Sequence, residues 1–373
     1  MLATAQAIEF ESAFADVAKV VDFPTPEAPR ALQNDLLALS SEMPVTAEGL
    51  TDIAAKAGSA GIAFAELTDF AEDAAQVAVA FDITAARAGD GLAVLRNVFG
   101  LTQDGVFALA GSINHLSNSM QSEAPEILDV LLRVGATGRT IGMAGEQVAA
   151  LGSAMLSTGT APEVVSTGLN ALIMRLATAT HQSKDFTTAL EGIGLKAPAL
   201  EAAVRRDASG AILGFLETVQ GSKDSLGVLS ELFGAEYADD IAKLVNNIDQ
   251  VRLGFQLVAN PVQYASSVTE EYGVRAATTA NQVQMFQNRI RNVGTLIGQV
   301  FLPPFNAALG VLSGLVLSTQ RFVQEYPMVG GVLVGGLAVI GASIALLGLL
   351  VLAIGAVGFA SAQLRIGMTA LQT

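Results

Sequence analysis

The chain has 373 residues, 51% of them apolar, and its 35 acidic and 20 basic side chains leave a formal net charge of −15. This acidity argues against sequence-specific nucleic-acid binding through a basic face and against a polybasic membrane anchor, because both need clustered Lys and Arg. Cysteine is absent, which excludes disulfides, thiolate metal ligands and thiol catalysis.

The first part of the chain carries most of this acidity and several helix starts. Residues 1–87 contain 14 acidic and 4 basic side chains, a pattern that is usually a solvated face and less often a docking surface. Helices are predicted to begin at Thr25-Pro26-Glu27, Thr46-Ala47-Glu48 and Thr102-Gln103-Asp104, because Thr is a good N-cap and the first turn favours Pro and acids. Thr160-Ala161-Pro162-Glu163 has the spacing of a capping box.

Apolar residues follow these starts at helical spacing. Leu32, Leu36 and Leu39 form one stripe, and a second stripe contains Val165, Leu169, Leu172, Ile173 and Leu176. Alternating strand patterns are missing. The sequence therefore predicts an all-α fold. An array of short amphipathic helices is expected in a core domain over residues 1–183. Longer helices follow, with a C-terminal hydrophobic, transmembrane-like helix or helical hairpin at the end.

Two further regions are expected between residues 184 and 326. Residues 184–260 form a smaller helical region with an irregular linker, which contains Gly192, Gly194, Pro198 and Gly210. Residues 261–326 begin with a polar, Gln- and Asn-rich stretch from Val262 to Asn292 that predicts a long exposed or inter-chain helix. Pro303 and Pro304 are expected to break or bend it, because proline removes a helical hydrogen bond and clashes with the preceding turn.

The strongest physical signal is a hydrophobic segment at residues 327–364, followed by a short tail at 365–373. The 39 positions between Glu325 and Arg365 contain no charged residue. A bilayer core needs about 20 apolar residues as helix, so this run can cross once or fold as a hairpin. Gly331, Gly335, Gly336 and Gly341 are the expected helix-contact residues, because small residues let helices approach closely. A buried core helix in a large assembly is the alternative.

Signals for catalysis are missing. His115 and His181 have no His, Asp or Glu at the spacing of known zinc motifs, and His115 is expected in a polar interruption between helices. Acidic pairs such as Asp239-Asp240 and Glu270-Glu271 point about 100° apart on a helix and do not converge. The sequence therefore predicts no catalytic, cofactor-binding or metal site, and a protein that is not an enzyme.

Short motifs follow one another in order from Phe10 to Leu176. They are Phe10–Phe23, Met43–Leu50, Ala57–Ala63, Phe70–Ala75, Ala80–Ala85, Phe99–Asp104, Ile113–Asn118, Val134–Ala136, Ala149–Gly152 and Gly168–Leu176, and Leu232–Gly234 and Phe301–Pro304 come later. Their order and spacing resemble the conserved core of phage tail tape-measure proteins, most closely the type of P2-like contractile-tailed phages and prophages. Members of that family usually carry a long coiled coil before this core and more sequence after the apolar run, so a fragment, a domain or a short relative is expected.

The resemblance implies a structural protein that occupies the tail lumen and sets tail length while tail tube subunits polymerise around it. It implies these partners: the tail tube protein, tail assembly chaperones, baseplate or tail tip proteins, other copies of the chain, and the host inner membrane. It also implies three locations, namely the host cytoplasm during assembly, the virion tail lumen, and the host inner membrane on infection, where the apolar segment would help DNA pass. The alternative is a bacterial helical membrane-inserting protein, either a pore-former or an anchored scaffold, which the apolar segment alone supports equally well.

Overall fold

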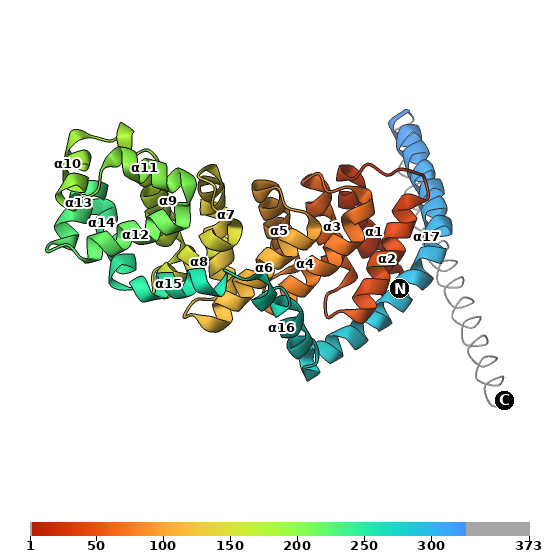
Figure 1. Ribbon diagram of the computed structural model, residues 1–373. Coiled ribbons are helices and arrows are strands. Elements are labelled where there is room, and N and C mark those ends of the chain that lie inside the picture. The colour runs from red at the N-terminus through yellow and green to blue at the C-terminus, as the bar shows by residue number, and fades with distance from the viewer. Residues whose placement is uncertain (1, 326–373) are drawn as a thin grey trace. The chain divides into compact units, whose positions relative to one another are not determined.

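A computed structural model describes residues 2–325 of the chain. Within these residues the chain forms α-helices α1–α17 and three short 3-10 helices, and it forms no strand, so the predicted all-α fold is confirmed (Figure 1). Two compact units are present, residues 1–300 and residues 301–373. The first unit is described almost completely, and the described part of the second is residues 301–325.

The helices are short up to residue 276. They are α1 (Leu2–Val20), α2 (Ala28–Glu42), α3 (Ala47–Ser59), α4 (Leu67–Phe81), α5 (Ala85–Phe99), α6 (Gln103–Ser119), α7 (Ala124–Thr140), α8 (Gly145–Leu156), α9 (Pro162–Ala177), α10 (Lys184–Gly192), α11 (Ala197–Arg206), α12 (Ala208–Gln220), α13 (Ser225–Phe233), α14 (Ala235–Asn246), α15 (Ile248–Leu257) and α16 (Ser267–Ala276). The 3-10 helices are Phe64–Glu66, Ala179–His181 and Pro261–Gln263. Helix α17 (Thr279–Glu325) is far longer, at 47 residues.

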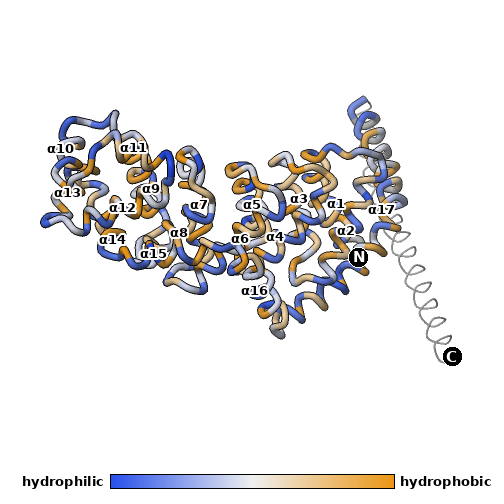
Figure 2. The backbone as a smooth tube through the Cα atoms, in the orientation of Figure 1, coloured by the Kyte–Doolittle hydropathy of each residue, from blue (hydrophilic) through white to orange (hydrophobic). Residues whose placement is uncertain are grey.

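The first nine helices form two packed rows. Helices α1, α3, α5, α7 and α9 contact one another in that order, and α2, α4, α6 and α8 form the second row. Figure 2 shows apolar and polar residues alternating along these helices, as expected where each helix turns one face to the other row. Most residues of the predicted stripes are buried: Leu32, Leu36 and all five apolar residues from Val165 to Leu176 are at most 1% exposed, and Leu39 is partly buried. One hydrophobic cluster continues from Phe14 to Val268.

Helices α15, α16 and α17 return along the second row. Helix α15 packs on α8 and α6, and α16 packs on α6 and α4. Glycines permit this close approach: a Cβ at Gly111 of α6 would collide with the backbone carbonyl of Tyr264, and one at Gly254 of α15 would lie 2.9 Å from the carbonyl of Ala150. The end of the first unit is thus brought back to its beginning, where α17 reaches α2 (Figure 1).

Two expectations for residues 184–278 are corrected. The irregular linker contains helices α10 and α11. Ser183 caps α10 by accepting a hydrogen bond from Phe186 N, α11 begins after Lys196 without a side-chain cap, and Asp207 caps α12 by accepting from Gly210 N. The long polar helix does not run from Val262. It begins at Thr279, because the chain turns at Ala277 and Thr278 after α16.

The N-cap predictions are half right. Thr46 and Thr102 accept hydrogen bonds from Gly49 N at 3.1 Å and Gly105 N at 3.2 Å. Helix α2, however, begins after Glu27 rather than at Thr25, and α9 begins after Ala161 without a side-chain cap. In both wrong cases a proline lies in the first helical turn. Its fixed φ and missing N–H suit that turn without a side-chain acceptor.

Helix α17 continues through Pro303 and Pro304, so the prolines do not break it, and a bend at these residues remains a prediction. The hydrophobic segment at 327–364 and Gly331, Gly335, Gly336 and Gly341 lie outside the described residues. The division into domains ending at residues 183, 260 and 326 also remains a prediction. The hydrophobic cluster crosses the first two of these borders.

Candidate functional site

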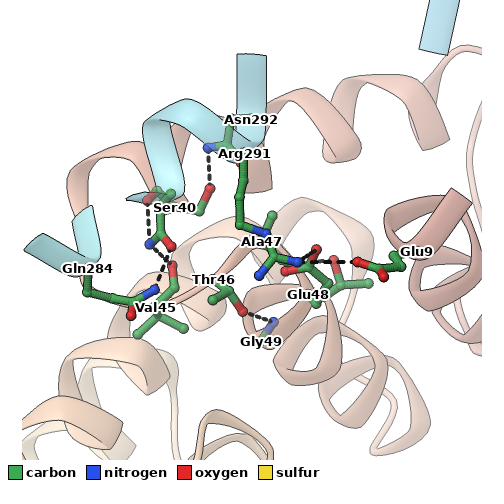
Figure 3. A network of polar contacts seen from close by, with 12 residues as sticks. Glu9, Ser40, Val45, Thr46, Ala47, Glu48, Gly49, Gln284, Arg291 and Asn292 are labelled. Atoms are coloured by element: carbon green, nitrogen blue, oxygen red, sulfur yellow. Dashed lines mark hydrogen bonds and ion pairs between the residues drawn. The ribbon is translucent and has the colours of Figure 1, made fainter. Parts of the chain in front are cut away.

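The first turns of α17 dock on the end of α2 through asparagine side chains (Figure 3). The Nδ2 group of Asn288 donates to the carbonyl oxygens of Ser40 at 3.0 Å, Met43 at 3.1 Å and Val45 at 2.8 Å. One turn later, the Nδ2 group of Asn292 donates to the carbonyl of Leu37 at 2.9 Å and to the Ser40 hydroxyl at 2.6 Å.

This polar contact has a clear physical cause. The last four carbonyls of a helix lack an intrahelical partner, and the Ser40 carbonyl is one of these in α2, which ends at Glu42. The Met43 and Val45 carbonyls lie in the connection between α2 and α3, where no helix supplies a donor. Asn288 and Asn292 are 2% and 6% exposed, so water is excluded and the side-chain amides supply the missing donors. Gln284 completes the set by donating to the Oδ1 atom of Asn288 at 2.9 Å. We call this group, Gln284, Asn288 and Asn292, the asparagine clasp.

Ion pairs flank the clasp. Arg291 lies 3.3 Å from both Glu9 of α1 and Glu48 of α3, and Arg289 donates to the Ser41 carbonyl at 2.8 Å. These groups are partly exposed, and surface pairs of this kind each contribute about 0.2–1 kcal/mol. They link α17 to α1 and α3, and the buried amides of the clasp add the hydrogen bonds to the end of α2 and the residues after it.

The opposite face of α17 is apolar and exposed. In the first unit this face carries Val283, Phe286, Ile290, Val293, Leu296 and Val300, each at least 48% exposed. The helix therefore has its polar side inward and its apolar side outward, the reverse of an ordinary surface helix. In the second unit, the large side chains Phe301, Phe305, Leu309, Val311, Val316 and Leu317 are also exposed.

Part of α17 is long and apolar enough to cross a membrane, by length and composition alone. This stretch is Thr279–Ser318, and its most apolar part is almost entirely unburied in the described structure. The stretch precedes the segment 327–364 that the sequence singled out, and it extends the apolar region into the described residues.

Chemistry is sparse in residues 2–325. No group of three or more His, Cys, Asp or Glu side chains that could hold a metal ion is found there. His115 lies inside α6 rather than between helices, so that expectation is wrong, and the His181 ring contacts the hydroxyl of Thr180. Asp239 and Asp240 both pair with Lys243 on their own helix.

One carboxyl has an unusual environment. Burial raises the pKa of Asp73 in α4 to about 6, although a hydrogen bond of 2.6 Å from the Gln103 side chain opposes the shift. Gln103 also accepts from Arg96, which pairs with Glu66 at 2.6 Å. This chain of contacts ties α4, α5 and α6 together, and its members bond to one another rather than converging on an open site.

The Leu232–Gly234 motif has a structural explanation. Gly234 adopts φ +77° and ψ 158°, a conformation that L side chains rarely adopt. Phe233 is fully buried, and the Arg175 guanidinium lies 5.7 Å from its ring centre while donating to the Leu232 carbonyl at 2.6 Å. Arg175 also stacks on Tyr237 at 5.9 Å. The motif therefore fixes α13 and α14 against α9.

The asparagine clasp and the exposed apolar face were not singled out from the sequence. The Asn- and Gln-rich composition was visible, but it did not show which amides are buried. The apolar face had a readable signal, the alternating three- and four-residue spacing from Val283 to Val300.

Comparisons with known proteins agree with the motif resemblance. Residues 33–234 match the family of phage-related minor tail proteins. A "Probable tape measure protein" of Halomonas phage phiHAP-1 is 29% identical over 380 residues, which cover 96% of this chain and 44% of the relative. The chain thus spans less than half the length of that relative. No solved structure matches.

The family match runs from within α2 to Gly234 at the end of α13, so helix α1 and helices α14, α15, α16 and α17 lie outside it. The similarity to the Halomonas phage protein extends over nearly the whole chain, which includes these helices. The resemblance to tail tape-measure proteins is thereby confirmed. The chain belongs to the phage-related minor tail protein family.

Proposed function

We propose that this chain is part of a tape-measure protein that sets tail length while tail tube subunits polymerise around it. The observation that carries the proposal is the similarity to a probable tape measure protein over 96% of the chain. Helix α17 is consistent with it, because a helix of 47 residues spans about 70 Å at 1.5 Å per residue. We propose a structural rather than an enzymatic role.

The proposed partners follow from this role. They are the tail tube protein, tail assembly chaperones, baseplate or tail tip proteins, and other copies of the same chain. The protein would assemble in the host cytoplasm and reside in the tail lumen. On infection its apolar segment would enter the host inner membrane and help DNA pass, without sequence-specific binding to that DNA.

Removal of the gene from the parent phage tests the assembly role. Tails of normal, uniform length should be lost, and expression of the gene in trans should restore them, as seen by electron microscopy. Tails of normal length without the protein would reject the proposal.

Membrane entry needs its own assay. The purified chain is mixed with liposomes made of bacterial inner-membrane lipids and then treated with protease. Protection of a fragment that includes residues 327–364 is expected. Complete digestion of that region in the presence of liposomes would reject membrane entry and leave the role in assembly intact.

A further inference from the structure

The exposed apolar residues of α17 follow a heptad pattern. Val283, Ile290 and Ile297 lie seven residues apart, and Phe286, Val293 and Val300 form a second series offset by three. These are the a and d positions of a coiled coil, which face a partner helix. We call these six residues the apolar seam. Five of them are exposed, and Ile297 is partly buried.

The body of the first unit occupies the other side of the helix. The buried residues Met285, Asn288, Asn292 and Thr295 fall at the c and f positions, which are opposite the seam. The asparagine clasp therefore fixes the rotation of α17 so that the seam points away from α2 and α3. A partner helix can reach the seam without displacing any of the hydrogen bonds to α2.

We infer that the apolar seam is the contact between copies of this chain, which pair through α17 as a parallel, in-register coiled coil. The inference specifies the self-contact named in the proposed function and rests on that function for its setting. A second copy is the occupant that the pattern favours, because a heptad seam is complementary to itself when two identical helices align.

The charges beside the seam fit this arrangement. Positions e and g hold Gln287, Arg289, Gly294 and Leu296 in the two central heptads, and no acidic residue lies between Glu271 and Glu325. In a parallel pair, a g residue faces the following e residue of the other helix. Arg289 would then face Gly294 of the second copy, so no like charges meet. Like charges directly opposed would weaken such a pair.

The available area is also sufficient. Six side chains that are about half exposed present roughly 500 Å² of apolar surface per copy, given aromatic side chains of about 150–250 Å² and smaller aliphatic ones. Two copies would bury about 1,000 Å², which is the size of a weak, transient interface. The pairing should therefore depend on protein concentration.

A membrane surface is a less suitable occupant of this part of α17. The seam is a narrow stripe, whereas a helix within lipid is apolar all round. Arg289 and Arg291 also lie within the same turns, and both are held by groups of the first unit. Lipid contact at the seam would overturn the inference.

Cysteine cross-linking provides a clean test, because the chain contains no cysteine. Phe286→Cys, Ile290→Cys and Val293→Cys are made singly in the full chain, purified in mild detergent and oxidised with copper phenanthroline. Val274→Cys is the matched control, since Val274 is a 71% exposed valine on α16 outside the seam. All three seam variants should form a covalent dimer at least about fivefold more than the control, since the same position meets itself in a parallel pair.

A second measurement avoids disulfides. Ile290→Glu should shift the protein from oligomer to its 38.3 kDa monomer in sedimentation equilibrium, whereas Val274→Glu should not. Circular dichroism should show unchanged helix content in both variants, because neither side chain packs into the core of its own chain. The inference would be overturned if the seam variants gave no more covalent dimer than Val274→Cys. It would also be overturned by cross-linking at one seam position alone, because that result indicates antiparallel packing. A fluorophore on Ile290→Cys that shifts to the blue only with liposomes would instead assign the seam to lipid.

Discussion

The side-chain amide of Asn288 donates a 2.8 Å hydrogen bond to the carbonyl of Val45, 243 residues earlier in the chain. This bond and its neighbours join the beginning of the first unit to its end. Their donors are buried amides, so the contact depends on specific hydrogen bonds more than on apolar area. Variants of single residues can test this description.

Asn288→Ala should destabilise the first unit by about 1–3 kcal/mol, because it removes the side-chain donor to the buried carbonyls of Ser40, Met43 and Val45. The free energy of unfolding from urea titration measures this loss, and hydrogen exchange in residues 279–300 should rise. Gln287→Ala, an exposed neighbour on α17, is the control and should stay within about 0.5 kcal/mol of the wild type. Equal effects of the two variants would rule out the asparagine clasp.

Asp73 should give stability a pH dependence. Because burial raises the pKa of the folded carboxyl from 3.8 to about 6, the folded state holds the proton more tightly than the unfolded state. Its stabilising contribution is therefore complete below about pH 4 and is lost as the pH rises to about 6. Asp73→Asn keeps an acceptor for Gln103 and cannot ionise, so it should stabilise the protein at pH 7 by about 1–2 kcal/mol after allowance for partial solvent screening.

Thermal unfolding at pH 4 and pH 7 checks this prediction. The difference between Asp73→Asn and the wild type should appear at pH 7 and shrink at pH 4. Asp35→Asn, at an exposed position of α2, should show no such difference. A constant difference at both pH values would mean that Asp73 does not titrate in this range.

Gly111 should tolerate no side chain. A Cβ there meets the Tyr264 carbonyl, so Gly111→Ala must push the chain before α16 away from α6, at a cost of about 1–3 kcal/mol. Gly273→Ala is the matched control, since nothing lies within 4 Å of its Cβ position on α16. That variant should stabilise by about 0.5–1 kcal/mol through helix propensity. The free energy of unfolding of both variants is measured by urea titration. A higher value than the wild type for both Gly111→Ala and Gly273→Ala would refute the close approach of α6 to Tyr264.

Substitution of Thr46 and of Thr25 by alanine should change the free energy of unfolding by different amounts, although both threonines precede a helix. Thr46 caps α3 through the 3.1 Å bond from Gly49 N, so Thr46→Ala should cost about 1 kcal/mol. The Thr25 side chain caps no helix, because α2 begins after Glu27. Thr25→Ala should therefore change the free energy of unfolding by less than about 0.5 kcal/mol. A larger loss at Thr25 than at Thr46 would contradict the observed start of α2.

The sequence predicted the parts of the fold that local chemistry controls. Helical spacing gave the all-α class and the buried stripe from Val165 to Leu176, and Thr46 and Thr102 marked real helix starts. It failed where several local signals competed. Pro29 and Pro162 lie in first turns that need no side-chain cap, so the threonines before them predicted the wrong cap residue.

The asparagine clasp could not be predicted because it depends on contacts between residues far apart in the chain. Nothing local distinguishes buried Asn288 from exposed Gln287, since both belong to one polar stretch. The difference in burial between them appears only when the chain turns after α16 and α17 meets the carbonyls of Ser40, Met43 and Val45. The heptad spacing of the apolar seam is local and can be read from the sequence. Its exposure to solvent could not be predicted, because that depends on which face of α17 is buried against the first unit.

Tail length in the parent phage tests the proposed function most directly. A second copy of residues 279–299, 21 residues or three heptads of α17, is inserted in frame, and tails are measured by electron cryomicroscopy. We expect uniform tails that are longer by about 31 Å, at 1.5 Å per residue. As a control, 21 residues inserted between Gly221 and Ser222, in the connection between α12 and α13, should leave the tail length unchanged. Normally assembled tails of unchanged length after the α17 duplication would contradict a ruler role for this helix.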